Sequence, residues 1–177
     1  MVSYPSIDIS LKDGFAVRSA DVERASDLQP VSLEVIGSAF AGSSFDGMVA
    51  SGSAVRVCSG APIPCGAEAV VSMEFCEVMS KGRVRVMADA VKGRNILRAG
   101  GEVNAGAPII KKGGVFMPGN MGLAAAAGIS RVRVFRRPKA AILAIGDEVV
   151  APGGRIRPGQ VYASNLVTLK AWLSFFG

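Results

Sequence analysis

The chain has 177 residues, 50% of them hydrophobic and 19% charged, and its 20 Lys and Arg outnumber its 14 Asp and Glu to give a formal net charge of +6. It contains no histidine, which excludes Ser-His-Asp and Cys-His catalysis, His-ligated zinc and a histidine pH switch. A chain of this size and composition can bury a core and is neither disordered nor a coiled coil.

The cysteines predict the cellular compartment. The chain has three cysteines, Cys58, Cys65 and Cys76. Their number is odd, no two of them form a C-x-x-C motif, and no signal-peptide pattern is recognised. We therefore expect reduced thiols in a cytoplasmic protein. No apolar run approaches the roughly 18 residues of a membrane-spanning helix, so no membrane partner is expected.

The positive charge allows nucleic acid or a small anionic ligand as a partner. The basic residues are concentrated at 81–85, 111–112 and 131–139. Aromatic side chains do not interleave with them, as a base-stacking surface would require. A small anionic ligand or a plain solvated basic face is therefore favoured, and no nucleic acid is expected.

Residues 1–13 are predicted to be an irregular lead-in, and residues 14–92 a β-rich unit. Short apolar runs recur between glycines in this unit, and residues 31–35 and 83–86 alternate with the period of half-buried strands. The predicted strands cover 15–18, 31–36, 54–58, 69–73, 76–79 and 84–87. A hairpin turn at 80–82 is expected to join the last two.

The chain is then rich in glycine up to residue 114, and a helix is predicted at 118–127. Pro118 suits its first turn, and Gly128 suits the position after its end. Residues 131–135 alternate like another strand. Residues 140–145 form a continuous apolar run, typical of a strand buried on both faces of a parallel sheet.

A final helix is predicted with Ser164 or Asn165 as its N-cap. Its apolar face carries the side chains of Leu166, Leu169, Leu173 and Phe176. A strand and an amphipathic helix make two thirds of a βαβ unit, and the returning strand is missing. We therefore expect this chain to be a piece of a longer protein.

Six collinear segments carry a resemblance to a known family. Residues 5–18 read PSIDISLKDGFAVR, 55–64 VRVCSGAPIP, 66–71 GAEAVV, 95–98 NILR, 142–150 ILAIGDEVV and 158–165 PGQVYASN. In order and spacing they resemble the MoeA family, whose corresponding motifs include P-x-x-D-x-S-x-M-D-G-Y-A-V-R, V-R-I-M-T-G-A-P-x-P, G-A-D-A-V-V, I-L-S-T-G-D-E-L-V and P-G-Q-I-Y-D-S-N.

The resemblance implies an α+β fold. A β-rich central domain (14–92) would be inserted into a mixed, elongated domain, of which 93–136 is a part. The first strand and helix of a truncated α/β molybdopterin-binding domain would follow at 137–177. A segment before residue 1 and the C-terminal half of the protein would be absent.

The resemblance also implies a molybdopterin molybdenumtransferase in molybdenum cofactor biosynthesis. Such enzymes insert molybdate into adenylylated molybdopterin with the help of a divalent cation, here Mg²⁺, and release AMP. The small anionic substrates would bind a cleft between the β-rich domain of one subunit and the α/β domain of the other in a homodimer. A molybdopterin adenylyltransferase would be the upstream partner.

Two motifs of the β-rich unit supply candidate site residues. Asp13, by itself a plain turn carboxylate, is implied by the resemblance to act on molybdate or to position a metal. Ser59 and Gly60 lie in a turn that puts a hydroxyl and flexible amides together, as in an oxyanion-binding nest. An ordinary turn is the alternative. Asp13, Ser59 and Glu102 are the predicted catalytic residues, and Gly60 is predicted to bind cofactor.

The last two motifs supply the other candidates. Asp147, after Gly146, follows the C-terminal end of the predicted strand at 140–145, where open α/β sheets bind ligands. Mg²⁺ takes oxygen ligands and usually one or two carboxylates, so Asp147 is the metal candidate; a turn or cap carboxylate is the alternative. Gly146, Ser164 and Asn165 are predicted to bind the cofactor. Ser164 and Asn165 would do so at a helix N-terminus, which favours a phosphate group. The alternative is that they only cap this helix.

Three departures from the family pattern change the local charge. The family motif G-E-D has a glutamate where this chain has Gly101. Glu102 occupies the aspartate position of the motif and could replace the missing carboxylate in part. Ala163 replaces the aspartate of Y-D-S-N, and Lys12 replaces the methionine before Asp13. These changes should weaken metal binding and favour an anion. A non-catalytic member that binds molybdopterin or molybdate, or acts as a scaffold, is therefore the alternative; a basic nucleic-acid-binding β-domain is a remote third hypothesis.

Overall fold

The structure is a computed structural model that describes residues 1–176. It divides into two compact units, Met1–Arg131 and Val132–Gly177, which we describe separately. The predicted domain limits at residues 14, 93 and 137 stay predictions.

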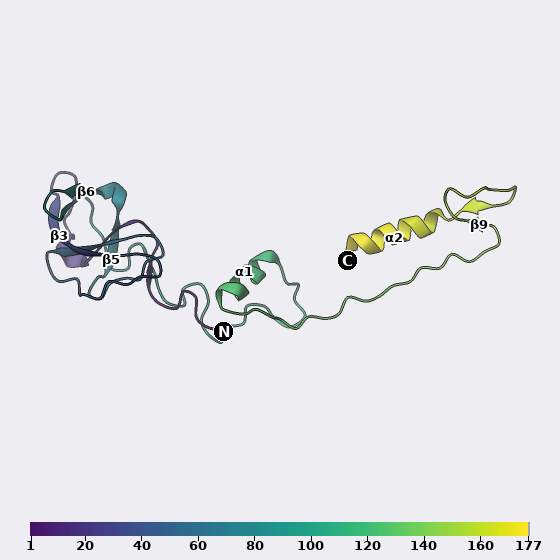
Figure 1. The fold of residues 1–177 in the computed structure, drawn as a ribbon, viewed down its shortest axis with the longest axis horizontal. Helices are drawn as coiled ribbons and strands as arrows, with labels where there is room; N and C mark the ends of the chain where they lie inside the picture. Colours follow the sequence, from purple (N-terminus) through teal and green to yellow (C-terminus); the bar gives the residue numbers. More distant parts are fainter. Residues whose placement is uncertain (177) are drawn as a thin grey trace. The chain divides into compact units, whose positions relative to one another are not determined.

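The first unit is built on a six-stranded mixed sheet in the order β5-β2-β4-β3-β7-β6. Figure 1 labels β3, β5 and β6 of this sheet. Its strands are β2 (Gly14–Val17), β3 (Val31–Ala39), β4 (Ser53–Val57), β5 (Ala69–Ser72), β6 (Cys76–Met79) and β7 (Arg83–Val86). All six predicted strands are confirmed, and β3 runs on to Ala39. Single 3-10 turns cover Ser19–Asp21 and Met73–Phe75.

The core of this unit lies on both faces of the sheet. Phe15 and Val17 of β2 pack into one cluster of buried side chains, whereas Ala16 between them packs into a second cluster on the other face. Successive side chains of a strand point to opposite faces, so β2 is buried on both sides. A strand held in this way fixes the backbone at residue 14, and with it the residues just before the strand.

Two connections complete the sheet. The predicted hairpin at 80–82 is confirmed, because β6 and β7 pair antiparallel and Lys81 and Gly82 have φ values of 63° and 67°. By contrast, β3 and β4 pair parallel, with an irregularity between Val35 and Gly37. The connection between them lies over β3, since a Cβ at Gly37 would collide with the ring of Phe45.

The lead-in is more regular than predicted. Strand β1 (Ile9–Ser10) pairs antiparallel with β8 (Ile96–Leu97), and Tyr4 bridges to Val103. Residues 4–10 therefore run beside residues 96–103. The prediction of an irregular lead-in fails only at Tyr4 and Ile9–Ser10. The segment that pairs with them lies some ninety residues away, beyond the reach of local patterns.

Helix α1 (Pro118–Ala126) confirms the predicted helix. Pro118 lies in its first turn, and the backbone N–H of Met117 donates to Oδ1 of Asn120 at 3.2 Å. Gly128 follows the helix with a φ of 78°, as a left-handed C-terminal glycine does.

The second unit contains the parallel pair β9 (Val149–Val150) and β10 (Val161–Tyr162), followed by α2 (Ser164–Phe176). The strands predicted at 131–135 and 140–145 are wrong, since neither stretch forms a strand in the part of the chain described. Leu143 and Ile145 are 83% and 88% exposed. A strand needs a hydrogen-bonded neighbour, and none of the described residues pairs with these stretches.

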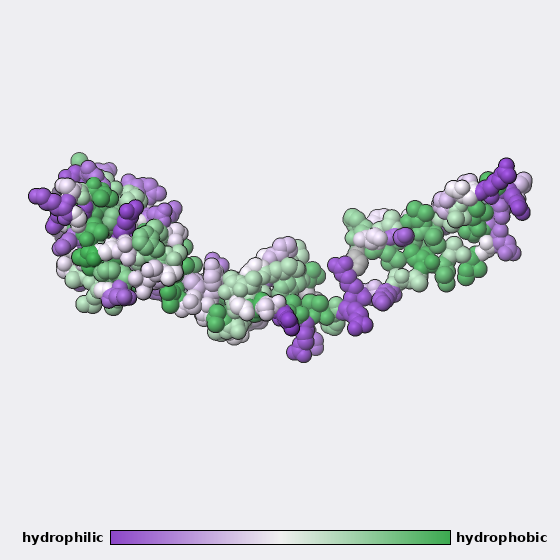
Figure 2. Space-filling model, in the orientation of Figure 1, coloured by the Kyte–Doolittle hydropathy of each residue, from purple (hydrophilic) through white to green (hydrophobic). Residues whose placement is uncertain are grey.

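Helix α2 begins at Ser164, and Ala163 is the residue before it. Ser164 and Asn165, one of which was predicted to be the N-cap, are therefore the first two residues of the helix itself. Its apolar side chains are exposed, as Figure 2 shows along this helix. Among residues 1–176, no helix is both long enough and apolar enough to span a membrane.

Candidate functional site

The structure brings two predicted site residues together. The backbone N–H of Ser59 donates a hydrogen bond of 2.7 Å to Oδ1 of Asp13. Both residues line an open cavity of about 610 Å³, which is also lined by Lys12, Arg56 and Glu74. The cavity therefore combines two carboxylates, a hydroxyl and two cationic side chains at the start of β2.

The Asp13-Gly14 pair is held by the neighbouring strand. The backbone N–H of Met73 donates to the carbonyl of Asp13 at 2.9 Å. A Cβ at Gly14 would collide with the carbonyl of Val71 in β5. Glycine is needed at this close approach of two backbones, and the residue before it is thereby fixed at the cavity.

The turn that carries Ser59 has no free amide to offer. Besides the Ser59 N–H, which Asp13 accepts, the N–H of Gly60 donates to the carbonyl of Ser10 at 2.8 Å, and the N–H of Ala61 donates to the carbonyl of Cys58 at 3.0 Å. The predicted oxyanion nest is therefore absent, because protein acceptors already occupy all three donors. Only the Ser59 hydroxyl, 3.5 Å from the carbonyl of Leu11, can turn to a ligand.

Ser10 links the two motifs, a role that we did not predict. It is 1% exposed, its N–H donates to the carbonyl of Ala61 at 2.9 Å, and its hydroxyl donates to the carbonyl of Lys12 at 2.6 Å. A buried hydroxyl must find such partners. The sequence signal that could have indicated this role is the Asp-x-Ser spacing of Asp8 and Ser10 in the first motif.

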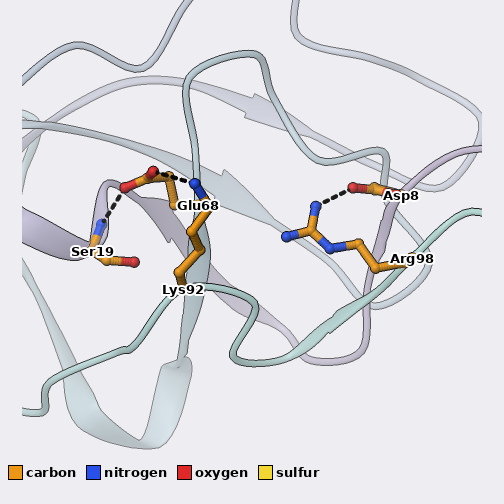
Figure 3. A network of polar contacts seen from close by, with 5 residues as sticks. All are labelled: Asp8, Ser19, Glu68, Lys92 and Arg98. Atoms are coloured by element: carbon orange, nitrogen blue, oxygen red, sulfur yellow. Dashed lines mark hydrogen bonds and ion pairs between the residues drawn. The ribbon is translucent and has the colours of Figure 1, made fainter.

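Asp8 ties the lead-in to the segment around Arg98 (Figure 3). Its carboxylate accepts the N–H of Ala99 at 2.8 Å and pairs with the Arg98 guanidinium. The Ala99 hydrogen bond, with help from Arg98, holds the pKa of Asp8 below its ordinary value of 3.8. This contact is structural, since it joins two parts of the backbone.

Glu102 lies in the same segment but outside the cavity of Asp13. It is exposed, and its N–H donates to the carbonyl of Tyr4 at 3.1 Å. The described residues that line the cavity do not include it. Its predicted catalytic role therefore rests on the family resemblance alone.

A second polar contact in Figure 3 joins Glu68, Lys92 and the backbone of Ser19. The Lys92 ammonium lies 3.1 Å from Oε1 of Glu68 and chiefly lowers the pKa of that carboxyl. The N–H of Ser19 donates to its other oxygen at 3.4 Å. Both side chains lie at the surface, so we infer that this contact only holds the loops around β5 together.

The remaining predicted residues lie in the second unit. Ser164 and Asn165 line an open cavity of about 380 Å³ with Glu148. Asp147 and Gly146 precede Glu148 in the chain, and the carbonyl of Asp147 accepts the side-chain amide of Gln160 at 3.4 Å. Among residues 1–176, the Asp147 carboxylate forms no hydrogen bond, so it does not serve as a cap there.

The described residues also bear on a metal site. In the range 1–176, no three side chains of His, Cys, Asp or Glu gather closely enough to hold a metal ion. A resident site with three or more carboxylates is thus absent from this part of the chain.

Comparison with known proteins identifies relatives over nearly the whole chain. The chain is 35% identical over 172 residues to a molybdopterin molybdenumtransferase of Haemophilus influenzae, and 35% identical over 170 residues to molybdopterin molybdenumtransferase 2 of Mycobacterium tuberculosis. These matches cover 97% and 96% of this chain but 41% and 42% of the relatives.

Solved structures give the same result. A molybdopterin biosynthesis MoeA protein from Pyrococcus horikoshii matches with a TM-score of 0.84 and 28% identity, over 98% of this chain and 46% of that protein. A sequence profile described as the MoeA N-terminal region (domain I and II) matches residues 1–128. The chain therefore belongs to the MoeA family.

Proposed function

We propose that this chain is part of a molybdopterin molybdenumtransferase, which inserts molybdate into adenylylated molybdopterin and releases AMP. Family membership supports the reaction class. The observation that carries the site is the hydrogen bond between Asp13 and Ser59 in a cavity with two cationic side chains.

The chemistry of the two residues divides their roles. An ionised carboxylate only accepts hydrogen bonds and repels an oxyanion, so Asp13 would accept a proton or hold a cation rather than bind molybdate itself. The Ser59 hydroxyl is a donor, so it can bind an oxygen of the anion. Asp13 also fixes the turn from which that hydroxyl projects.

Asp147 and Glu148 supply two adjacent carboxylates for Mg²⁺. This donor set fits the ion, because Mg²⁺ usually takes only one or two protein carboxylates and completes its shell with phosphate and water. A bound Mg²⁺ would neutralise charge on the phosphates of the substrate. Ser164 and Asn165, in the first turn of α2, would bind such a phosphate beside it.

The assembly and setting follow from the same proposal. The whole protein would be a homodimer whose cleft takes residues from both units, in different subunits. It would receive its substrate from a molybdopterin adenylyltransferase, because the adenylylated form must be made before it is consumed. Its three free cysteines suit a cytoplasmic protein.

One observation favours a non-catalytic member of the family as the alternative. Gly101 and Ala163 lack the carboxylates of the family pattern, and a Cβ at Gly101 would lie 2.9 Å from the carbonyl of Arg98. Gly101 therefore lacks the acidic side chain, and the backbone around it leaves little room for one. Such a protein would bind molybdopterin or molybdate without turnover.

The test is an insertion assay with the full-length protein, adenylylated molybdopterin, molybdate and Mg²⁺. We expect AMP to be released in step with molybdenum bound to molybdopterin. Binding of molybdopterin without AMP release would support the non-catalytic alternative, and the absence of both would overturn the proposal.

A further inference from the structure

The Asp13 cavity is lined by two cationic side chains that form no ion pair within residues 1–176. Lys12 and Arg56 both line it and are both exposed. The ion pairs among residues 1–176 all involve other basic side chains: Arg85, Lys92, Arg94 and Arg98. The charges of Lys12 and Arg56 are therefore available to a ligand.

The backbone of the Ser59 turn cannot bind an anion in this place. All three of its amides already donate to protein acceptors, so an oxyanion beside Ser59 would be held mainly by side chains. Lys12, Arg56 and the Ser59 hydroxyl are the donors that line it.

Both cationic side chains begin from a fixed backbone. Residue 12 is held on two sides by the Ser10 hydroxyl, which donates to the Lys12 carbonyl at 2.6 Å and accepts the Lys12 N–H at 3.3 Å. Arg56 lies in β4 and is paired with Phe15 of β2. A ligand would therefore have to order only the two side chains, not the chain that carries them.

The charge balance gives Lys12 a specific task. Asp13 and Glu74 place two negative charges on the cavity, and Arg56 alone would leave an excess of one. Lys12 brings the lining to neutrality directly beside Asp13. An anion close to the Asp13 carboxylate is repelled unless such a cation offsets that charge.

We propose that Lys12, together with Arg56, holds a dianionic oxyanion beside the Ser59 hydroxyl in this cavity. Two ligands of the proposed reaction share this chemistry: molybdate, and the phosphate monoester of the AMP that is released. The identity of the anion rests on the proposed function, whereas the anion site itself rests on the cavity. Lys12 would bind the anion directly.

Four variants test the proposal. Lys12→Met and Arg56→Met each remove one positive charge from the cavity, and Lys12→Arg keeps the charge at residue 12. Lys112→Met is the control, because it removes an exposed lysine outside the cavity. Molybdate and AMP are titrated separately into each chain by calorimetry, at low and at high salt. KM for molybdate and kcat are measured in the full-length protein.

Lys12→Met and Arg56→Met should each weaken binding of one of the two anions by about fivefold to tenfold at low salt, and less at high salt. Lys12→Arg should retain most of the affinity, and Lys112→Met should change nothing. If molybdate is the ligand, KM for molybdate should rise in Lys12→Met while kcat stays within about twofold.

The outcomes separate this site from the proposed function. Weaker anion binding in Lys12→Met in a protein without insertion activity would leave the site standing and overturn the proposed function. Equal binding of both anions by Lys12→Met, Arg56→Met and the unaltered chain would overturn the site, whatever the activity. An equal loss in Lys112→Met would overturn it as well, because the effect would then be one of overall charge.

Discussion

The Ser59 N–H and the Asp13 carboxylate, 46 residues apart in the sequence, are joined by a hydrogen bond of 2.7 Å. This bond connects the first two motifs of the chain at one cavity. Asp13 is followed by glycine for a separate reason: Gly14 passes so close to the Val71 carbonyl that a Cβ would collide with it. The carboxylate therefore has a structural task in addition to any chemical one.

The stability of this contact can be measured by comparing Asp13→Asn with Asp13→Ala. The asparagine side chain still offers an oxygen to the Ser59 N–H, so its free energy of unfolding should equal that of the unaltered chain within about 0.5 kcal/mol. The alanine variant should lose about 1 kcal/mol, because one hydrogen bond is missing. Urea denaturation of both variants gives the difference; equal stability of the two would show that this bond adds nothing.

The Asp8 carboxylate should make stability depend on pH in the acid range. Its pKa is lowered, chiefly by the Ala99 N–H and also by Arg98, so its contribution is present above the ordinary value of 3.8 and is lost as the pH falls through the lower folded value. Asp8→Asn should therefore melt at a lower temperature than the unaltered chain at neutral pH, and the gap should close in strong acid.

Asp27→Asn is the matched control for this experiment, since Asp27 is exposed and forms no hydrogen bond among residues 1–176. Its melting temperature should follow that of the unaltered chain at every pH. A gap for Asp8→Asn that persists unchanged in strong acid would show that the charge of Asp8 is not its source.

Thiol reactivity should differ sharply along the chain. Burial, with the nearby Glu74 charge, raises the pKa of Cys76 from 9.0 to about 12. The thiolate is the reactive form, so at mildly alkaline pH this cysteine should be alkylated roughly a thousandfold more slowly than a thiol of ordinary pKa. Exposed Cys65 provides the comparison within the same chain. Mass spectrometry of iodoacetamide-treated protein should find Cys65 modified first; equal rates would contradict the raised pKa of Cys76.

Restoring the two missing carboxylates should lower the Mg²⁺ concentration needed for insertion. The variant is Gly101→Glu with Ala163→Asp in the full-length protein, and added carboxylates strengthen binding of a divalent cation. The backbone at Gly101 itself is not left-handed: the positive φ of 72° belongs to its neighbour Gly100, in a turn closed by the Gly101 N–H and the Arg98 carbonyl.

Gly101→Glu carries a different cost, since its Cβ would lie 2.9 Å from the Arg98 carbonyl. Thermal melts of each single variant show whether the fold tolerates it. A folded double variant with an unchanged Mg²⁺ requirement would mean that neither position controls the metal.

The exposed face of α2 should cause self-association of the 177-residue chain. Leu169, Leu173 and Phe176 are 51%, 47% and 79% exposed, and burial of each such side chain is worth about 1.5–3 kcal/mol. Leu169→Gln with Leu173→Gln should lower the apparent mass in sedimentation experiments. A chain that is monomeric at high concentration with and without these changes would contradict this expectation.

Local patterns predicted all six strands of the large mixed sheet, but not the short strands β1, β8, β9 and β10. The alternation at 83–86 and the turn at Lys81 predicted the β6–β7 hairpin, since both signals are local. The parallel pairing of β3 with β4 and the pairing of β1 with β8 join distant segments. No spacing within either segment determines such partners.

The apolar run at 140–145 shows the limit of this reasoning. Its composition is that of a buried strand, but Leu143 and Ile145 are exposed, because a strand forms only against a partner. For the site, the motifs predicted Asp13 and Ser59 but not their contact. They also suggested an amide nest whose donors the fold uses internally, which only coordinates can reveal.

The rate of molybdate insertion by full-length Asp13→Asn tests the central claim most directly. This variant keeps the acceptor for Ser59 and removes the charge, so folding should stay within about 1 kcal/mol of the unaltered protein. Insertion should fall at least about tenfold, or about 1.4 kcal/mol of barrier, whereas Asp27→Asn should be fully active. An Asp13→Asn protein that folds normally and inserts molybdate at the unaltered rate would show that this carboxylate is only a structural contact and that the proposed site is wrong.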